Sequence, residues 1–269
     1  MKGGVIQTNL ARCRDCYSCV RACSVKAVRV HEAQAQVVQE LCLVCGTCVR
    51  ACPQSAKQVR EDRPVVERAL AEGRRVYASV APSAPAFFNL TSFATMVEAL
   101  QGLGFAGASE TALGAEMVGR AYGELLLLSH ARRPAIATAC PVVVNLVEMY
   151  YPDLIPNLAP IVSPMIAHAR LLRQRHGQDA FIVFVGPCLA KKAEMLDEAV
   201  RGVVDAALTF GELRSWLSDS AVRLGGMEVQ QEATERPPAR LFPLEGGLIG
   251  TAHLPTDMLG GHSVVASGL

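Results

Sequence analysis

Eight of the ten cysteines in this 269-residue chain fall into two runs with the same internal spacing, and no other feature constrains the fold as strongly. In each run, two C-x2-C steps are followed by one C-x3-C step. The first run comprises Cys13, Cys16, Cys19 and Cys23, and the second comprises Cys42, Cys45, Cys48 and Cys52. Such short steps wrap a tight loop around a small inorganic group, and the fourth cysteine begins a short helix.

This spacing is typical of bacterial ferredoxins that bind two [4Fe-4S] clusters, in which the fourth cysteine of each run ligates the other cluster. We therefore expect one cluster on Cys13, Cys16, Cys19 and Cys52 and the other on Cys42, Cys45, Cys48 and Cys23. Between the runs, residues 25–30 and 35–38 have the pattern of short strands. The sequence thus predicts an α+β ferredoxin-like module with a pseudo-symmetric repeat.

Other uses of these cysteines fit the sequence less well. Zinc knots use four ligands per ion, usually in separated pairs, and would not explain two matched runs. The N-terminus has no apolar segment of the signal-peptide kind, so we expect a cytoplasmic, reducing location in which disulfides are rare.

Composition excludes several function classes. The formal charge is +1 and there is no basic stripe, so we expect neither a nucleic-acid nor a membrane partner. The longest apolar runs, such as residues 125–128 and 181–185, are far shorter than the roughly 20 residues that span a bilayer. We find no glycine-rich phosphate loop and no Ser-His-Asp set.

A charged segment near residue 63 divides the chain into expected domains at 1–63 and 64–269. In the second domain, strand-like segments at 75–80, 135–139, 181–185 and 203–209 alternate with helical ones at 92–102, 116–129, 142–150 and 164–176, and residues 230–240 read as a loop. This alternation predicts an α/β domain with a largely parallel sheet.

The two remaining cysteines, Cys140 and Cys188, each stand beside a proline and follow a predicted buried strand. A lone buried cysteine is more often inert packing than a ligand. Because ligands bind at the carboxyl ends of parallel strands, the shared context of these two cysteines indicates a common metal site. His168 and His176 are too far apart on one helix to chelate a single ion, and we expect them to be solvated or capping residues.

These residues resemble a known family. The segment Pro187-Cys188-x2-Lys191-x2-Glu194 resembles the P-C-x2-K-x2-E signature of the [FeFe] hydrogenase catalytic domain. Further similar segments are Cys140-Pro141, Tyr150-Tyr151-Pro152, Ser163-Pro164, Ala81-Pro82-Ser83 and Gly246-Gly247. The resemblance spans the whole chain, and it implies an α/β hydrogenase-like domain behind the ferredoxin-like module.

In that family four cysteines hold a cubane, and one of them bridges to a diiron unit with carbonyl and cyanide ligands. The resemblance implies that Cys140 and Cys188 are two of the four and that Lys191 donates to a cyanide. It also makes Pro82, Ser83, Ser163, Pro187 and Glu194 cofactor-binding residues. The alternative for Lys191 and Glu194 is a surface ion pair at i,i+3 spacing.

The chain departs from the family pattern in its proton path. Ala139 stands where the family has a proton-transferring cysteine, and Ala159 stands where it has a serine. The acidic residue expected on an earlier helix falls near Tyr122, with Glu124 close by. Because each proton transfer needs a positioned acid or base, we expect slow turnover.

The family's last two cluster cysteines lie in a C-x3-C loop that this sequence lacks. We therefore expect domain 64–269 to be truncated at its C-terminus. The expected cofactors are two [4Fe-4S] clusters, with a third bearing the diiron unit if the absent ligands are supplied.

Three functions remain open at this point. The leading one is an electron-transfer protein of the sensory or regulatory hydrogenase type, with a redox protein or domain, H₂ and a downstream PAS-type domain as partners. The second is an active hydrogenase that interconverts H⁺, electrons and H₂. The third is a non-catalytic iron–sulfur assembly or scaffold protein. Lys191 favours a diiron site over the scaffold, and Ala139 favours the sensor over the fast enzyme.

Overall fold

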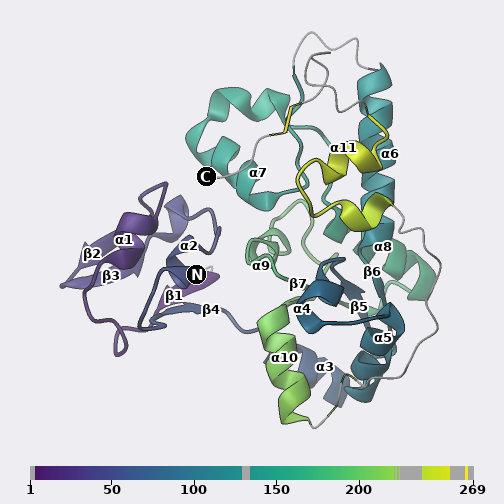
Figure 1. Ribbon diagram of the computed structural model, residues 1–269, viewed down its shortest axis with the longest axis horizontal. Helices are drawn as coiled ribbons and strands as arrows, with labels where there is room; N and C mark the ends of the chain where they lie inside the picture. The colour runs from purple at the N-terminus through teal and green to yellow at the C-terminus, as the bar shows by residue number, and fades with distance from the viewer. Residues whose placement is uncertain are drawn as a thin grey trace.

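The computed structural model describes residues 4–128, 134–220, 222, 224, 238–254 and 264–265. An N-terminal module with small antiparallel sheets lies beside a larger body built on a parallel sheet (Figure 1). The chain passes once from the module to the body, after strand β4 (Figure 1). The α+β module followed by an α/β body confirms the predicted fold class.

The N-terminal module repeats one unit twice. Strand β1 (Ile6–Thr8) pairs antiparallel with β4 (Lys57–Val59), and β2 (Val28–His31) pairs antiparallel with β3 (Gln34–Val37). Helices α1 (Ser18–Ala22) and α2 (Thr47–Arg50) begin at corresponding points of the two cysteine runs, and a 3-10 helix, η1, covers Gln39–Leu41. Both α-helices follow a residue in the left-handed region, Tyr17 at φ 53° and Gly46 at φ 80°. This turn directs each loop into its helix. The expectation that the fourth cysteine begins the helix is wrong, because Cys23 is the C-cap of α1 and Cys52 comes after the C-cap of α2.

The body is organised around four parallel strands in the order β6-β5-β7-β8. They span Val76–Val80 (β5), Gly107–Glu110 (β6), Phe181–Gly186 (β7) and Ala206–Thr209 (β8). Every residue of β7 is buried, as expected for a central parallel strand with both faces covered. The predicted parallel sheet is confirmed, and β6 is a strand that the sequence pattern missed.

Helices cover this sheet, and further helices pack on them. Their bounds are Arg63–Ala71 (α3), Ala84–Phe88 (α4), Phe93–Gly102 (α5), Ala112–Leu128 (α6), Pro141–Tyr150 (α7), Pro164–His176 (α8), Lys191–Glu194 (α9), Phe210–Asp219 (α10) and Gly247–Thr251 (α11), with 3-10 helices at Pro152–Asn157 (η2) and Pro238–Leu241 (η3). Helix α8 lies against β5 and β7, and α6 packs on α8. Among the described residues, no helix has the length and hydrophobicity needed to cross a membrane. The predicted helices at 92–102, 116–129, 142–150 and 164–176 are confirmed, with α6 beginning at Ala112. Residues 230–237 of the predicted loop 230–240 lie outside the described residues, and residues 238–240 belong to the 3-10 helix η3.

The predicted strand at 135–139 is wrong. Only Ile136 pairs there, in an isolated bridge with Leu158. The Thr138 amide donates to the hydroxyl of Tyr122 (2.7 Å), and the Thr138 hydroxyl donates to the carbonyl of Ile161. These groups are bonded to α6 and a loop, so the segment has no free edge to add to the sheet. Cys140 therefore lies at the N-cap of α7 and does not follow a sheet strand.

The expectation that His168 is solvated is also wrong. Its side chain is fully buried, with Nδ1 2.7 Å from the Ser79 hydroxyl and Nε2 3.0 Å from the Ser109 hydroxyl. Burial lowers the pKa of His168 to about 4, which keeps the ring neutral between α8 and the sheet. His176 instead stacks on Tyr77 with 3.9 Å between ring centroids.

Four charged side chains anchor the segment between the two modules; we call them the junction cluster: Arg60, Asp62, Lys192 and Glu212. The ammonium of Lys192 is almost fully buried and lies 3.0 Å from Glu212 Oε1 and 3.4 Å from Asp62 Oδ2. Arg60 pairs with Asp62 at 2.8 Å and also donates to the Lys192 carbonyl. Two positive and two negative groups thus join the linker to α9 and α10.

Helices α6 and α8 cross closely at Gly114, where a Cβ atom would lie 2.7 Å from Cβ of His168 and would also meet the Pro164 carbonyl oxygen. We expect Gly114→Ala to lower the free energy of unfolding by about 1–3 kcal/mol, because the helices must separate to admit the methyl group. Denaturant unfolding of reconstituted protein, followed by circular dichroism, measures this change.

Gly250→Ala in α11 is the matched control. Nothing lies within 4 Å of its added Cβ, so we expect it to be neutral or to stabilise by up to ~1 kcal/mol. Equal stabilities for the two variants would contradict the close crossing of α6 and α8.

Candidate metal centres

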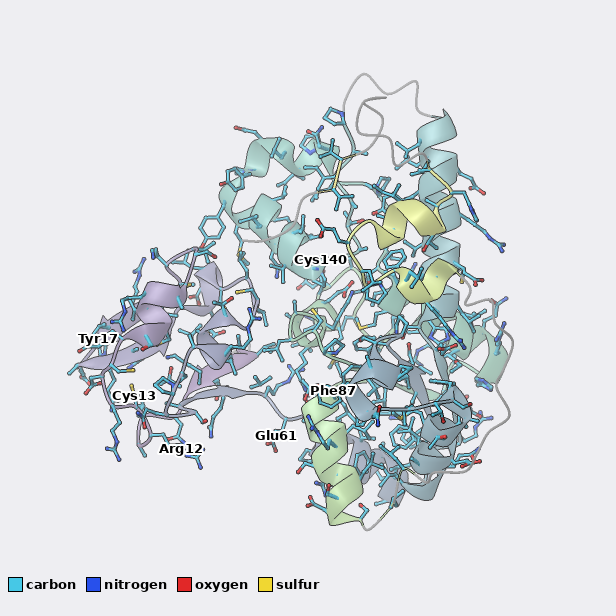
Figure 2. The ribbon with its side chains drawn as sticks, viewed as in Figure 1. Arg12, Cys13, Tyr17, Glu61, Phe87 and Cys140 are labelled. Atoms are coloured by element: carbon cyan, nitrogen blue, oxygen red, sulfur yellow. The ribbon has the colours of Figure 1, made fainter. Side chains whose placement is uncertain are left out.

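The first expected cysteine set surrounds one small cavity. Cys13, Cys16, Cys19 and Cys52 all line it, and Lys57 lines it too. Cys52 comes from the second run and the other three from the first. Cys16 is exposed and Cys13 is partly so, and Figure 2 shows Cys13 beside Tyr17 at the outer side of the module. The structure thus brings together the four thiols that the spacing assigned to one cluster.

The second expected set comprises Cys42, Cys45, Cys48 and Cys23. Burial raises the pKa of the Cys42 thiol, and the nearby Cys45 and Cys23 raise it further. Burial also raises the pKa of Cys48 to about 12, with Cys42 and Cys45 adding to the shift. Because a neighbour must be close to act in this way, Cys23 lies near Cys42 of the second run.

Backbone amides point at the sulfur atoms of both runs. The Ala27 amide lies 3.2 Å from the Cys23 sulfur, and the Ala56 amide lies 3.2 Å from the Cys52 sulfur. The Val44 amide lies 3.4 Å from the Cys42 sulfur. Such donors stabilise thiolates and so favour metal binding. In the part of the chain that the structure describes, no three His, Cys, Asp or Glu side chains are close enough to share a single metal ion.

The strand order of the body reverses between β5 and β7. The chain leaves β5 for β6 on one side, and β7 leads to β8 on the other, so the carboxyl ends of β5 and β7 form a switch point of the kind where ligands bind. The Ala81 amide donates to the Val185 carbonyl at 2.8 Å. Pro82 and Ser83 are half-buried just after β5, and Cys188 follows β7. The switch point therefore lies next to Cys188.

Lys191 joins the loop of Cys188 to the segment before Cys140. Its ammonium is buried, 2.7 Å from a Glu194 carboxylate oxygen and 3.3 Å from the Ala139 carbonyl oxygen. Burial raises the pKa of the Cys188 thiol, Lys191 opposes that shift and Cys140 adds to it. The structure therefore brings Cys140, Cys188, Lys191 and Glu194 together, with the ion pair largely shielded from water.

Ser163 has a hydroxyl without a partner. It is 2% exposed at the start of α8, and its oxygen is the one buried side-chain polar atom without a hydrogen bond among the described residues. A buried unpaired hydroxyl costs about 1–3 kcal/mol and calls for an explanation. The resemblance makes Ser163 a cofactor-binding residue, and a bound cofactor that pairs with its hydroxyl would provide that explanation.

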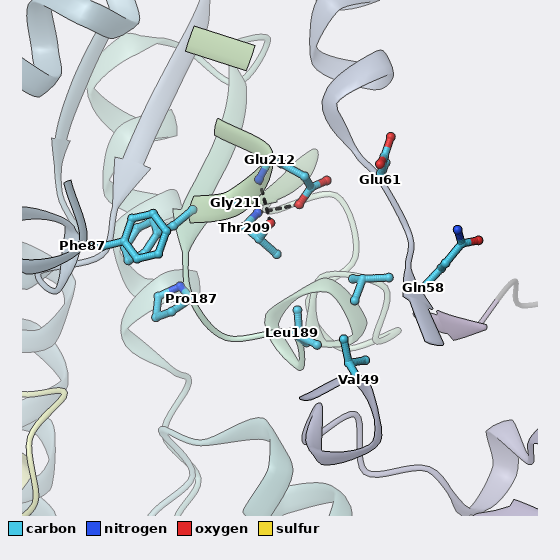
Figure 3. A pocket seen from close by; sticks show the side chains of 11 residues that line it. Val49, Gln58, Glu61, Phe87, Pro187, Leu189, Thr209, Gly211 and Glu212 are labelled. Carbon is cyan, nitrogen blue, oxygen red and sulfur yellow. Dashed lines mark hydrogen bonds between the residues drawn. The ribbon is translucent and has the colours of Figure 1, made fainter. Parts of the chain in front are cut away.

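A larger cavity of about 590 Å³ lies between the module and the body (Figure 3). Val49 and Val59 line it from the module, and Phe87, Phe210 and Leu189 line it from the body. Pro187 also lines this cavity, so its part in a cofactor pocket stays a prediction. No pattern in the sequence predicts this cavity, because its walls come from segments far apart in the chain.

The second cysteine run touches the body beside Cys188. A Cβ atom on Gly46 would lie 3.0 Å from the Leu189 side chain, so glycine permits this approach as well as the turn. The hydroxyl of Tyr150, at the end of α7, donates to the Leu41 carbonyl at 2.8 Å, one residue before Cys42. These contacts make the loop of the second run the part of the module nearest the body site.

Two parts of the chain match known protein families. Residues 12–63 match the 4Fe-4S dicluster domain, and residues 74–262 match the C-terminal domain of the iron-only hydrogenase large subunit. The chain is 29% identical over 143 residues to the periplasmic [Fe] hydrogenase large subunit of Nitratidesulfovibrio vulgaris. This match covers 47% of this chain and 34% of that protein.

Solved structures of [FeFe] hydrogenases share the fold. One, from a study of stepwise H-cluster assembly, has a TM-score of 0.53 and 25% identity over 64% of this chain and 50% of that chain. An apo [FeFe] hydrogenase variant from Chlamydomonas reinhardtii has a TM-score of 0.51 and 24% identity over 64% of this chain and 51% of that chain. The chain thus spans about half the length of these structures and about a third of the curated relative.

The crossed pairing of cysteines predicts which double substitutions are redundant. We expect Cys19→Ala and Cys52→Ala, alone or together, to leave about four of eight irons per chain, because both remove the same cluster. Cys19→Ala combined with Cys23→Ala, both in one run, should remove nearly all iron. Iron analysis and electron paramagnetic resonance of the reduced protein measure these losses.

Ser24→Ala, next to Cys23, is the control and should keep full iron. Zinc in the reconstituted protein, or near-complete iron loss in the Cys19/Cys52 double variant, would contradict the assignment.

Proposed function

Because this chain belongs to the iron-only hydrogenase large-subunit family, we propose that it is an electron-transfer hydrogenase homologue that turns hydrogen over slowly. The observation that carries the proposal is the methyl side chain of Ala139 at the position where the resemblance calls for a proton-transferring cysteine. The chain has an N-terminal 4Fe-4S dicluster domain, so its first task is to move single electrons.

An electron route through the chain follows from which cysteines are exposed. Cys16 and Cys13 lie at the surface, so a redox protein or domain can exchange electrons with the cluster that we assign to them. The second cluster would then pass electrons to the body where Gly46 approaches Leu189. A cytoplasmic location and a PAS-type regulatory partner remain predictions from the sequence, and the curated relative is a periplasmic protein.

The donor set at the switch point fits part of a hydrogenase cofactor. Cys140 and Cys188 would supply two thiolates and Lys191 supplies a buried ammonium. The resemblance adds Ser163, whose buried hydroxyl has no hydrogen bond to any described residue. The resemblance calls for four thiolates, so two must come from outside the ten cysteines of this sequence. When bound, the cubane with its diiron unit would supply the site at which protons and electrons combine to H₂.

Lys191 is the residue best placed to orient a bound anion. Glu194 and the Ala139 carbonyl hold its ammonium by hydrogen bonds, so little side-chain entropy remains to be lost on binding. Burial strengthens its interaction with cyanide-like anionic ligands. An assembly scaffold without a diiron unit has no use for this charge, and Lys191 therefore favours the hydrogenase-like site.

The positions that the resemblance assigns to a proton path lack acid or base groups that face the site. Ala159 and Tyr122 are buried in one apolar cluster with Ala137, whereas Glu124 is exposed. A methyl group at 139 and at 159 can neither accept nor donate a proton, and Glu124 faces water instead of the site. Each missing acid or base typically lowers a rate by 10² to 10⁴, about 3 to 5 kcal/mol of barrier.

One contact supports the alternative of an active hydrogenase. The hydroxyls of Tyr122 and Thr138 lie 2.9 Å apart, two residues from Cys140, and such a pair can pass a proton if a neighbour completes the chain. In that case Tyr122→Phe would abolish hydrogen production, whereas the slow homologue that we propose would be unaffected.

We expect the matured chain, supplied with the two further thiolates, to evolve little hydrogen from a reduced viologen dye. Ala139→Cys should raise this rate by 10² or more, because a thiol restores one acid-base group. Ala137→Cys, two residues earlier, is the control and should leave the rate unchanged. Rapid hydrogen evolution by the chain with Ala139 intact would contradict the proposal.

Lys191→Met should move or remove the carbonyl and cyanide infrared bands of the matured protein, because it removes a donor to the cyanide. Lys26→Met, which changes an exposed lysine in the N-terminal module, should leave these bands in place. Absence of any such bands in the protein with Lys191 intact would favour the scaffold function instead.

A further inference from the structure

Lys57 is a buried lysine inside the iron–sulfur module. It begins strand β4 and is 4% exposed. Its ammonium donates to the Thr8 hydroxyl at 2.6 Å and to the Ala35 carbonyl at 2.5 Å. These two hydrogen bonds hold the charge at a fixed point between β1, β3 and β4.

No carboxylate compensates this charge. Among the described residues, the ion pairs involve other lysines and arginines, and none includes Lys57. Burying an ammonium without a counter-charge is strongly unfavourable. The anions available nearby are thiolates, because Lys57 lines the same cavity as the Cys13, Cys16, Cys19 and Cys52 set.

The pseudo-symmetry of the module reveals the asymmetry of this charge. Lys57 stands five residues after Cys52, and Val28 stands five residues after Cys23. Both begin a strand, and both are buried to the same degree, at 4% and 5% exposed. One repeat thus carries a positive charge where the other carries a methyl-bearing side chain, so the two cluster environments differ in charge.

We propose that Lys57 is a positioning residue whose ammonium raises the reduction potential of the cluster on Cys13, Cys16, Cys19 and Cys52 above that of the second cluster. A cubane with four thiolates is an anion and gains one negative charge when it accepts an electron, so a fixed nearby cation stabilises the reduced form. The outer cluster then holds an electron more readily than the one beside the body. This inference rests on the proposed assignment of cysteines to two clusters.

Potentiometric titration of the reconstituted chain, followed by electron paramagnetic resonance, tests the proposal. Lys57→Gln keeps a donor for Thr8 and Ala35 but removes the charge, so the higher midpoint potential should shift negative and the gap between the two should narrow. Lys57→Arg keeps the charge and should retain the gap. Lys26→Gln removes an exposed lysine of the same module and should change neither potential.

Iron analysis separates the possible failures. Unchanged potentials in Lys57→Gln with full iron content would overturn the proposal, while the two-cluster assignment would stand. If Lys57→Gln loses iron, the test passes to Thr8→Val, which removes one hydrogen bond of the ammonium but keeps its charge. The gap between the two midpoint potentials should then persist in fully loaded protein, and its loss would overturn the proposal. Equal effects of Lys57→Gln and Lys57→Arg on a fully loaded module would show a packing role and would also overturn it.

Discussion

The junction cluster fixes how the two modules meet. Lys192 is the most deeply buried charge in it, and its ammonium contacts both Asp62 from the linker and Glu212 from α10. The carboxylate of Glu212 also accepts from the Asp62 amide and from the Thr209 amide, so it serves the linker and the helix cap at once. Removing one member of such a set leaves an uncompensated buried charge, typically about 3–5 kcal/mol. The placement of the N-terminal module therefore depends on these contacts.

The electron route that we propose depends on that placement. With the linker anchored to α9 and α10, the loop of the second cysteine run lies against Leu189, beside Cys188. Tyr150 adds a second contact from α7, the helix that Cys140 caps. Electron transfer weakens steeply with distance, so the proposed route would require an anchored interface. The same interface leaves the first run at the surface, where a partner can reach it.

Spacing carried most of what the sequence could predict. Cysteine steps of fixed length force short loops, so the two cluster sets could be assigned before any coordinates, and the apolar run of β7 predicted a buried central strand. The prediction of a strand at 135–139 is wrong because the Thr138 amide donates a hydrogen bond to the Tyr122 hydroxyl, a partner set by tertiary packing. Lys57 and Lys192 were missed for a similar reason. A lysine next to a polar residue, as Lys57 is to Gln58 and Lys192 is to Lys191, reads as exposed, and only the folded chain shows what buries it.

Iron-edge anomalous diffraction from crystals of the reconstituted chain tests the central claim most directly, namely that two clusters with crossed ligands lead electrons to the Cys188 site. The account predicts two compact iron peaks in the N-terminal module. One should be bounded by Cys13, Cys16, Cys19 and Cys52, and the other by Cys23, Cys42, Cys45 and Cys48. The second should lie nearer the loop of Leu189. Iron peaks each bounded by the four cysteines of a single run, or a first cluster nearer the body than the second, would contradict it.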